Sequence, residues 1–273
     1  MQPSSTNPSP LLEARNLRKT FPAPGSAFAA GNRGHVAAVD DVSLELAAGE
    51  TLAIVGESGS GKTTLARMLL RLVEPDSGEL RVEGRDFLAA RGVNLRALRR
   101  EMQMVFQDPF ASLDPRMSVG TIVSEPLEIH EPRLSRFERR DRVAEMLRAV
   151  GLAEDALTRY PHEFSGGQRQ RIGIARALVL RPRLVVADEP VSALDVSVGA
   201  QILELLQNLQ RDFSLTYLLI SHSLPVVAQL ATRIAVMQGG RIVETGAAEQ
   251  ILNAPTHPYT QSLIAAIPVL PPR

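Results

Sequence analysis

Residues 51–64 read Thr-Leu-Ala-Ile-Val-Gly-Glu-Ser-Gly-Ser-Gly-Lys-Thr-Thr, and the fold can be inferred outward from this stretch. Its first five residues are mostly apolar, as in a buried strand, and residues 56–63 match the pattern G-x-x-x-x-G-K-[ST]. The run that follows, residues 64–70, is typical of a helix. In such a strand, loop and helix, glycines let backbone N–H groups surround a phosphate, and the helix N-terminus adds a favourable dipole. The stretch therefore predicts a phosphate-binding loop.

The side chains of this loop favour a nucleotide phosphate as the ligand. Lys62 is expected to neutralise the β- and γ-phosphates, and the Thr63 hydroxyl is expected to ligate Mg²⁺. Lys19 and Lys62 are the only lysines among 30 lysines and arginines, and a compact ammonium fits a tight phosphate cradle where a planar guanidinium does not. The residues expected to bind the nucleotide are Gly56, Glu57, Ser58, Gly59, Ser60, Gly61, Lys62, Thr63 and Thr64.

Composition limits the classes of protein to which the chain can belong. Its 273 residues, 44% of them hydrophobic, suffice for one large α/β domain or a domain with a subdomain. Basic and acidic residues number 30 each, so no basic surplus indicates binding to nucleic acid. The absence of cysteine excludes disulfides, thiolate zinc sites and thiolate-held iron–sulfur clusters.

The N-terminus shows no targeting signal. Residues 1–10 are rich in Pro and Ser and are expected to be disordered. They lack the basic and apolar regions of a secretory signal, and no run in the chain reaches the roughly 18 apolar residues that span a bilayer. We therefore expect a cytoplasmic protein that reaches a membrane only through partners.

Apolar periodicity predicts a strand-rich first part, a helical segment near residues 95–175 and an alternating α/β part after it. Residues 22–35 are expected to form an irregular insertion. Helices are expected at residues 139–150, with Gly151 as cap, and around residues 202–209. The expected strands are residues 11–17, 36–46, 51–55, 79–82, 183–187, 215–220 and 233–237.

Two further motifs carry chemistry. The apolar residues 184–187 end in Asp188 and Glu189, where the first acid is expected to hold Mg²⁺ and the second to polarise the attacking water. Upstream, Ser165-Gly166-Gly167-Gln168 opens a helix whose bare glycine amides suit an anion. We refer to these four residues as the signature segment.

In this order, the motifs closely resemble those of the ATP-binding cassette (ABC) ATPases, and the resemblance runs from about residue 11 to residue 268. It implies an ATPase whose cofactors are ATP and Mg²⁺. Gln107 would contact Mg²⁺ or the nucleophilic water, His222 would contact the γ-phosphate, and Phe21 would stack on adenine. The implied catalytic residues are Glu189, His222, Lys62 and Gln107, and the implied metal ligands are Thr63, Gln107 and Asp188.

The resemblance also implies the fold. This is a P-loop NTPase core, with a RecA-like parallel sheet covered by helices on both faces, an antiparallel β subdomain and an inserted α-helical subdomain. The implied parts are the nucleotide-binding core at residues 11–95 and 176–240, the helical subdomain at 96–175 and a tail at 241–273.

The resemblance further implies a dimer that acts at a membrane. The resemblance implies that two nucleotide-binding subunits close head to tail, with Ser165, Gly166, Gly167 and Gln168 facing the ATP of the other subunit. Ser192-Ala193-Leu194-Asp195 would lie at the dimer interface. Two transmembrane permease subunits and an extracytoplasmic solute-binding protein would complete the transporter, at the cytoplasmic face of the plasma membrane and without nucleic acid.

Two segments narrow the resemblance to peptide importers: residues 105–116 and residues 257–263. Importers of nickel and glutathione share them, so the substrate stays open. Relatives often have Asp directly after the histidine that corresponds to His222, whereas this chain has Ser223 there. The cysteine-containing tail of some relatives is not present.

Three other classes of protein agree less well with the sequence. A soluble ABC ATPase usually has two cassettes in one chain or a long coiled coil, and this sequence shows neither. A non-hydrolytic switch conflicts with the presence of Asp188, Glu189 and His222, and an exporter conflicts with the importer-like segments.

Overall fold

The computed structural model describes residues 10–22, 35–108 and 111–266. The chain divides into two compact units: a first unit of Met1–Ala90 with Ala231–Arg273, and a second unit of Arg91–Leu230. The expected disorder of residues 1–10 and the expected insertion at residues 22–35 lie almost wholly outside the described residues, as do Pro109, Phe110 and the last seven residues.

The first unit contains an antiparallel sheet of order β2-β1-β4-β5. In the second half of β2, buried Val42, Leu44 and Leu46 alternate with polar residues, so one face of this strand packs on a core. The strands are β1 (Leu12–Pro22), β2 (His35–Leu46), β4 (Ser77–Val82) and β5 (Arg85–Asp86).

The described residues of the same unit form three more strands and three helices. All five residues of β3 (Thr51–Val55) are buried, as expected of a strand paired in parallel, and β3 pairs in parallel with β9 (Arg233–Gln238). Strand β10 is antiparallel to β9. The remaining elements are β10 (Arg241–Ala247), α1 (Lys62–Leu69), α8 (Ala248–Asn253) and α9 (Pro258–Ala265).

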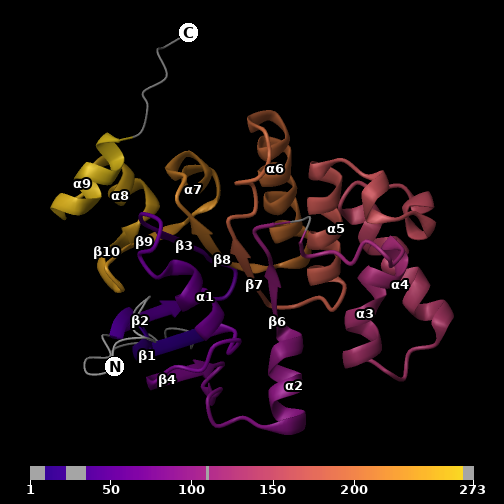
Figure 1. The fold of residues 1–273 in the computed structure, drawn as a ribbon, viewed down its shortest axis with the longest axis horizontal. Coiled ribbons are helices and arrows are strands. Elements are labelled where there is room, and N and C mark those ends of the chain that lie inside the picture. Colours follow the sequence, from indigo (N-terminus) through magenta and orange to yellow (C-terminus); the bar gives the residue numbers. More distant parts are fainter. Residues whose placement is uncertain (1–9, 23–34, 109–110, 267–273) are drawn as a thin grey trace, which may run out of the picture. The chain divides into compact units, whose positions relative to one another are not determined.

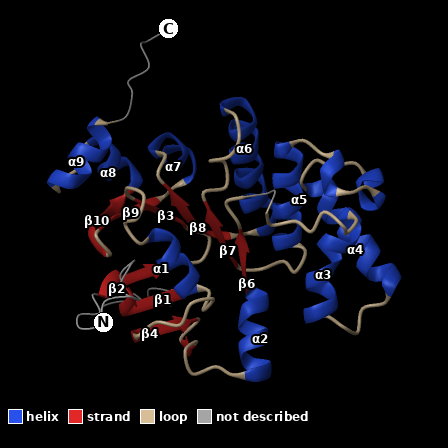
Figure 2. Cartoon of the chain, in the orientation of Figure 1, coloured by secondary structure: helices blue, strands red, loops and turns tan. Residues whose placement is uncertain are grey.

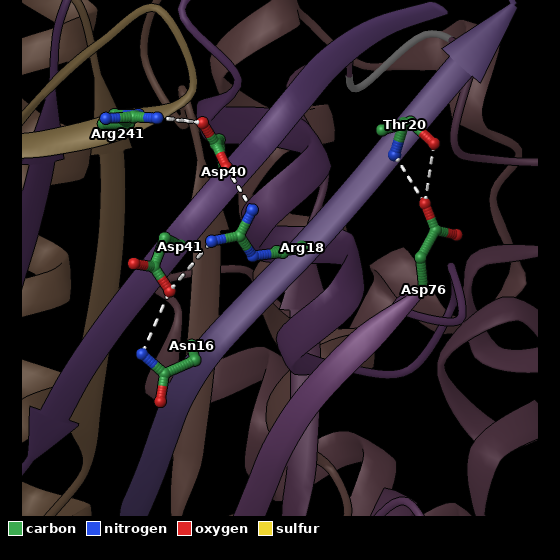
Figure 3. A network of polar contacts seen from close by, with 7 residues as sticks. All are labelled: Asn16, Arg18, Thr20, Asp40, Asp41, Asp76 and Arg241. Carbon is green, nitrogen blue, oxygen red and sulfur yellow. Dashed lines mark hydrogen bonds and ion pairs between the residues drawn. The ribbon is translucent and has the colours of Figure 1, made fainter.

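Charged side chains tie these strands together, as Figure 3 shows. Asp40 on β2 accepts hydrogen bonds from Arg18 on β1, at 3.0 Å, and from Arg241 Nε on β10, at 2.8 Å. Asp76, one residue before β4, accepts from the backbone N–H and the hydroxyl of Thr20 at 2.7 and 2.9 Å. The Lys19 ammonium and the Thr20 donors lower the pKa of Asp76 to about 2.

The second unit contains a parallel sheet of order β8-β7-β6 and most of the helices (Figure 2). Its strands are β6 (Met102–Val105), β7 (Leu184–Asp188) and β8 (Thr216–Ser221). Its helices are α2 (Gly92–Glu101), α3 (Val119–His130), α4 (Arg136–Ala149), α5 (Gly166–Leu178), α6 (Val196–Phe213) and α7 (Leu224–Leu230), with short 3₁₀ turns at Glu154–Thr158 and Pro161–Glu163.

Helices α3, α4 and α5 pack on one another in the second unit (Figure 1). The expected apolar stripe of α4 is confirmed, because Val143, Met146 and Leu147 are buried. This helix begins three residues earlier than periodicity predicted, at Arg136, because Ser135 forms a capping box with Glu138.

One strand falls where the sequence predicted helix. Strand β6 lies within residues 95–175 and pairs in parallel with β7. Its four residues, Met-Gln-Met-Val, are too few for a period of two to be told from a helical period. Only pairing with a distant segment makes them a strand.

The expectation of a mixed α/β protein with parallel and antiparallel strands is confirmed. Among the described residues, no helix combines the length and the apolar character needed to cross a bilayer.

Candidate nucleotide-binding and hydrolytic site

The phosphate loop connects β3 to α1 and depends on two glycines. Gly56 has φ 155°, and a Cβ there would lie 2.1 Å from the carbonyl oxygen of Met237. Gly61 has φ 106°, and a Cβ there would lie 2.0 Å from the carbonyl oxygen of Ala38. Any side chain at either position would collide with the backbone of neighbouring strands, so the tight curve of the loop requires glycine.

Lys62 lies at the first position of α1 and is buried. Its Nζ donates to the carbonyl oxygens of Gly56 at 2.8 Å and Glu57 at 2.7 Å, and to Ser60 Oγ at 3.3 Å. The ammonium is therefore held against the loop by oxygen acceptors of the loop itself. Thr63 and Thr64 follow in the first turn of α1, which carries no acidic side chain to oppose an anion.

The loop is anchored from two sides by segments far along the chain. Gly240, in the turn between β9 and β10, donates its N–H to the Ser60 carbonyl at 3.0 Å and accepts from the Asp40 N–H at 2.8 Å. On the other side, the Glu57 N–H donates to the hydroxyl of Tyr259 at 3.0 Å. Sequence reasoning missed this role of Tyr259, because 202 residues separate it from Glu57 and no local pattern indicates the contact.

Phe21, the residue expected to stack on adenine, lies near the end of β1 with 40% of its surface exposed. The Nζ of Lys19 lies 5.7 Å from the centre of its ring. Lys19 Nζ also donates to Asp76 Oδ1 at 2.7 Å, so the Lys19 ammonium is fixed beside the ring. An exposed aromatic ring can stack on a flat nucleotide base.

In the second unit, three predicted residues meet at the carboxyl ends of three parallel strands. Gln107 follows β6, Glu189 follows β7 and His222 follows β8. Gln107 Nε2 donates to Glu189 Oε2 at 2.9 Å, and His222 Nδ1 lies within hydrogen-bonding distance of Glu189 Oε1, at 2.8 Å. Both oxygens of the Glu189 carboxylate are thus directed by side chains 82 and 33 residues away. We call these three residues the hydrolytic cluster.

The backbone at Glu189 is strained. Its φ of 48° lies in the left-handed region, which costs a non-glycine residue about 1–3 kcal/mol. The strain is held by the Glu189 N–H, which donates to the Ile220 carbonyl at 2.9 Å, and by the Ser192 hydroxyl, which donates to the Glu189 carbonyl at 3.1 Å. Strain of this kind is typical of a functional side chain whose direction is fixed. The preceding Asp188 ends β7 and is only 3% exposed, so its carboxylate is withdrawn from water.

The turn that carries His222 is built around its two serine neighbours. Ser221 Oγ accepts from the Ser223 N–H at 3.0 Å and donates to the Ser223 carbonyl at 3.3 Å. The backbone of Ser223 is therefore held on the side chain of Ser221. In this chain that contact fixes the turn, with Ser in the position where family members often have Asp.

The signature segment forms a closed capping box at the start of α5. Ser165 Oγ accepts from the Gln168 N–H, and Gln168 Oε1 accepts from the Ser165 N–H at 3.0 Å. Gly167 is buried against α6, where a Cβ would lie 2.4 Å from Val198 Cγ1. Asp195 caps α6 by accepting from the Val198 N–H at 2.9 Å. Hence the signature segment and Asp195 are joined through Val198.

Arg176 on α5 braces the segment around Gln107 and was missed by sequence reasoning. Its guanidinium lies 5.9 Å from the ring centre of Phe106, and it donates to the Ser112 carbonyl at 2.5 Å. Burial lowers the pKa of this arginine. The helix that begins with the signature segment therefore also holds both sides of the Gln107 loop.

The predicted site residues fall into two sets. Phe21 and residues 56–64 belong to the first unit, whereas the hydrolytic cluster, Asp188 and the signature segment belong to the second. The donors predicted for Mg²⁺ are a hydroxyl, a carboxylate and an amide, from Thr63, Asp188 and Gln107. Such an oxygen-only set fits that hard cation.

Two family models match this chain. One described as ABC transporter matches residues 39–192, and one described as the oligopeptide/dipeptide transporter C-terminal region matches residues 243–273. A probable peptide ABC transporter ATP-binding protein of Sinorhizobium fredii is 52% identical over 96% of this chain and 74% of its own length. The dipeptide transport ATP-binding protein DppF of Lactococcus lactis is 50% identical over 96% of this chain and 83% of its own length.

Solved structures of ATP-binding cassettes have the same fold. A dimeric cassette in a post-hydrolysis state, bound to ADP and Pi, superposes with a TM-score of 0.75 at 29% identity, covering 87% of this chain and 98% of that one. A cassette from Clostridium perfringens, part of the transporter complex cbiONQ, gives a TM-score of 0.75 at 26% identity, covering 89% of this chain and 90% of that one. These superpositions confirm the fold class expected from the sequence.

Proposed function

This chain belongs to the ABC transporter family of ATP-binding proteins, and from that membership we propose that it is the ATP-hydrolysing subunit of an importer for dipeptides or oligopeptides. The match of residues 243–273 to the peptide-transporter tail supports a peptide substrate and disfavours an exporter or a soluble ATPase. Glutathione is a second candidate, because the glutathione import ATP-binding protein GsiA of Escherichia coli is 51% identical over 96% of this chain and 42% of its own length.

The hydrolytic cluster is the observation that carries the ATPase mechanism. We propose that a Glu189 oxygen accepts the proton of a water that attacks the γ-phosphorus of ATP. The new P–O bond forms as the bond to the bridging β–γ oxygen breaks, which yields ADP and phosphate. Gln107 and His222 hold the carboxylate in a single orientation before reaction, so little reorganisation is needed in the transition state.

The phosphate loop supplies binding and charge neutralisation in this proposal. Lys62 keeps its hydrogen bond to the Gly56 carbonyl and exchanges its other loop acceptors for oxygens of the β- and γ-phosphates, and the N-terminus of α1 adds a favourable dipole. When bound, Mg²⁺ would neutralise phosphate charge, with Thr63, Asp188 and Gln107 as its protein-side donors. Phe21 is proposed to stack on the adenine.

A second subunit is needed to complete the reaction cycle in this proposal. Ser165, Gly166, Gly167 and Gln168 would bind the ATP held by the other subunit. Val196, the residue after Asp195, is 91% exposed, and an apolar side chain in that position suits a subunit interface. Closure would depend on the γ-phosphate, and its hydrolysis would release the two subunits.

A groove in the second unit is our candidate contact for the permease. It has a volume of about 720 Å³ and lies along α3 and α4. Phe137, which lines it, is 72% exposed, and three arginines, Arg136, Arg139 and Arg140, also line the groove. A groove lined by both apolar and charged side chains suits a short amphipathic helix of a membrane subunit. That contact would place the protein at the cytoplasmic face of the plasma membrane.

Reconstitution tests the proposal. The protein is combined with its permease subunits and solute-binding protein in vesicles, and ATPase activity is measured with and without a dipeptide, an oligopeptide or glutathione. Peptide-stimulated hydrolysis with peptide uptake supports the proposal. Stimulation by glutathione alone transfers the assignment to glutathione. Hydrolysis that none of the three solutes stimulates overturns the assignment to peptides and to glutathione.

A further inference from the structure

The C-terminal segment that resembles peptide transporters is fastened to β10 by one carboxylate. Glu244 accepts from the Thr256 N–H and hydroxyl, both at 2.7 Å, and from the His257 N–H at 3.1 Å. Burial opposes the charged form of Glu244, but the hydrogen bonds from Thr256 and His257 favour it, and the pKa of Glu244 is lowered to about 2. The carboxylate is therefore ionised at neutral pH and fixes the start of α9.

This attachment sets the direction of Tyr259. His257 Nδ1 accepts from the Tyr259 N–H at 3.2 Å and caps α9, so the first turn of the helix is fixed as well as its starting point. The tyrosine side chain reaches the phosphate loop, where its hydroxyl accepts from the Glu57 N–H at 3.0 Å.

The peptide group that donates a hydrogen bond to Tyr259 also accepts one from Lys62. The carbonyl of Gly56 and the N–H of Glu57 belong to one planar peptide unit. The N–H points to Tyr259 Oη, at 3.0 Å, and the carbonyl accepts from Lys62 Nζ, at 2.8 Å. In a trans peptide these two groups point in opposite directions, so a hydrogen bond that orients one also orients the other. Hydrogen bonds in series through such a unit also polarise one another.

We propose that Tyr259 is a positioning residue for nucleotide binding: its hydroxyl orients the 56–57 peptide plane and thereby places the Lys62 ammonium. The C-terminal segment thus prepares the phosphate loop of its own chain. This inference rests on the proposed function, because it assumes that Lys62 binds the phosphates of ATP.

The test is Tyr259→Phe in the full-length protein, which removes the hydroxyl and keeps the ring. Loss of one hydrogen bond of ordinary net strength is expected to raise the Kd for MgATP by about two- to tenfold. Glu244→Gln, which loosens the whole segment, is expected to shift the Kd in the same direction. The matched control is Tyr217→Phe, which removes a tyrosine hydroxyl bonded to the Leu206 carbonyl at 3.1 Å in the second unit. The control should lower Tm and leave the Kd unchanged.

A double-mutant cycle separates positioning of Lys62 from a general effect on the loop. Binding of a fluorescent ATP analogue is measured for Lys62→Ala with and without Tyr259→Phe. If Tyr259 acts through Lys62, the second change adds less than about 1.5-fold in that background. Fully additive effects overturn the inference about Tyr259 but not the proposed function. The same holds if Tyr259→Phe has a normal Kd for the nucleotide while Lys62→Ala binds it more weakly. Normal binding by Lys62→Ala instead overturns the proposed role of the phosphate loop.

Discussion

Replacing Glu189 by Gln tests the hydrolytic cluster most directly. The substitution keeps the size of the side chain and removes its charge. The amide oxygen of Gln can still accept from Gln107 Nε2, which donates to Oε2 at 2.9 Å. Its NH₂ can donate to His222 Nδ1, provided that the imidazole carries its proton on Nε2. The geometry should survive, so the variant is expected to fold and to bind MgATP.

The expected loss is therefore chemical. An amide cannot accept the proton of the attacking water, and general-base catalysis contributes about 10²–10⁴-fold to such reactions. That range corresponds to about 2.7–5.4 kcal/mol of transition-state stabilisation. Since ATP then stays intact between the subunits, closed dimers should accumulate.

Two measurements check this outcome: phosphate release per subunit, and size-exclusion chromatography with and without MgATP. Glu204→Gln, an exposed position on α6, is the matched control for loss of one carboxylate and should keep normal turnover. Phosphate release by Glu189→Gln within about threefold of wild type would refute the role of Glu189, because general-base loss exceeds that factor. Loss of MgATP binding would refute the argument that the amide preserves the cluster.

Three further predictions follow from single contacts. Lys62→Ala should weaken MgATP binding by at least about tenfold, as expected when a charge-assisted phosphate contact is lost; titration of a fluorescent nucleotide measures it, and unchanged binding would contradict the predicted loop function. Gly56→Ala should lower the free energy of unfolding by about 3 kcal/mol or more, because its Cβ would lie 2.1 Å from the Met237 carbonyl oxygen. Denaturant unfolding compares this variant with Gly84→Ala, where φ is also positive but the added Cβ meets no atom within 4 Å. The pKa of Asp76 is about 2 in the folded protein and 3.8 ordinarily, so the contribution of its charge to stability is complete above about pH 3.8 and is lost as the pH falls towards 2. The difference in the free energy of unfolding between wild type and Asp76→Asn should therefore shrink over that interval. A constant difference would show that the Asp76 charge is not responsible.

Local patterns indicated most of the elements. Continuous apolar runs marked β3, β7, β8 and β9, because strands inside a parallel sheet are buried on both faces. The 3.6-residue period marked α4 and α6. Strand β6 could not be predicted from the sequence, because its four residues show no recognisable period and form a strand only by pairing with β7.

The candidate site shows the same division between local pattern and long-range contact. Asp188 and Glu189 are recognisable in the sequence because they end an apolar run, whereas Gln107 and His222 are identified by the resemblance of the residues around them to the family motifs. That Gln107 and His222 each hold one oxygen of the Glu189 carboxylate could not be read from the sequence, nor could the strained φ of Glu189. Both depend on the order of the parallel strands and on the loops between them.

The phosphate loop illustrates what each level of description decides. By itself, the sequence of residues 51–64 determined a strand, a glycine-rich turn and a helix with Lys62 at its start, since these follow from local backbone preference and from the size of an ammonium group. Only the tertiary structure decided which groups hold that loop: Met237 and Ala38 exclude side chains at Gly56 and Gly61, and Tyr259 orients the 56–57 peptide. These contacts join residues up to 202 positions apart, and only folding brings such residues within hydrogen-bonding distance.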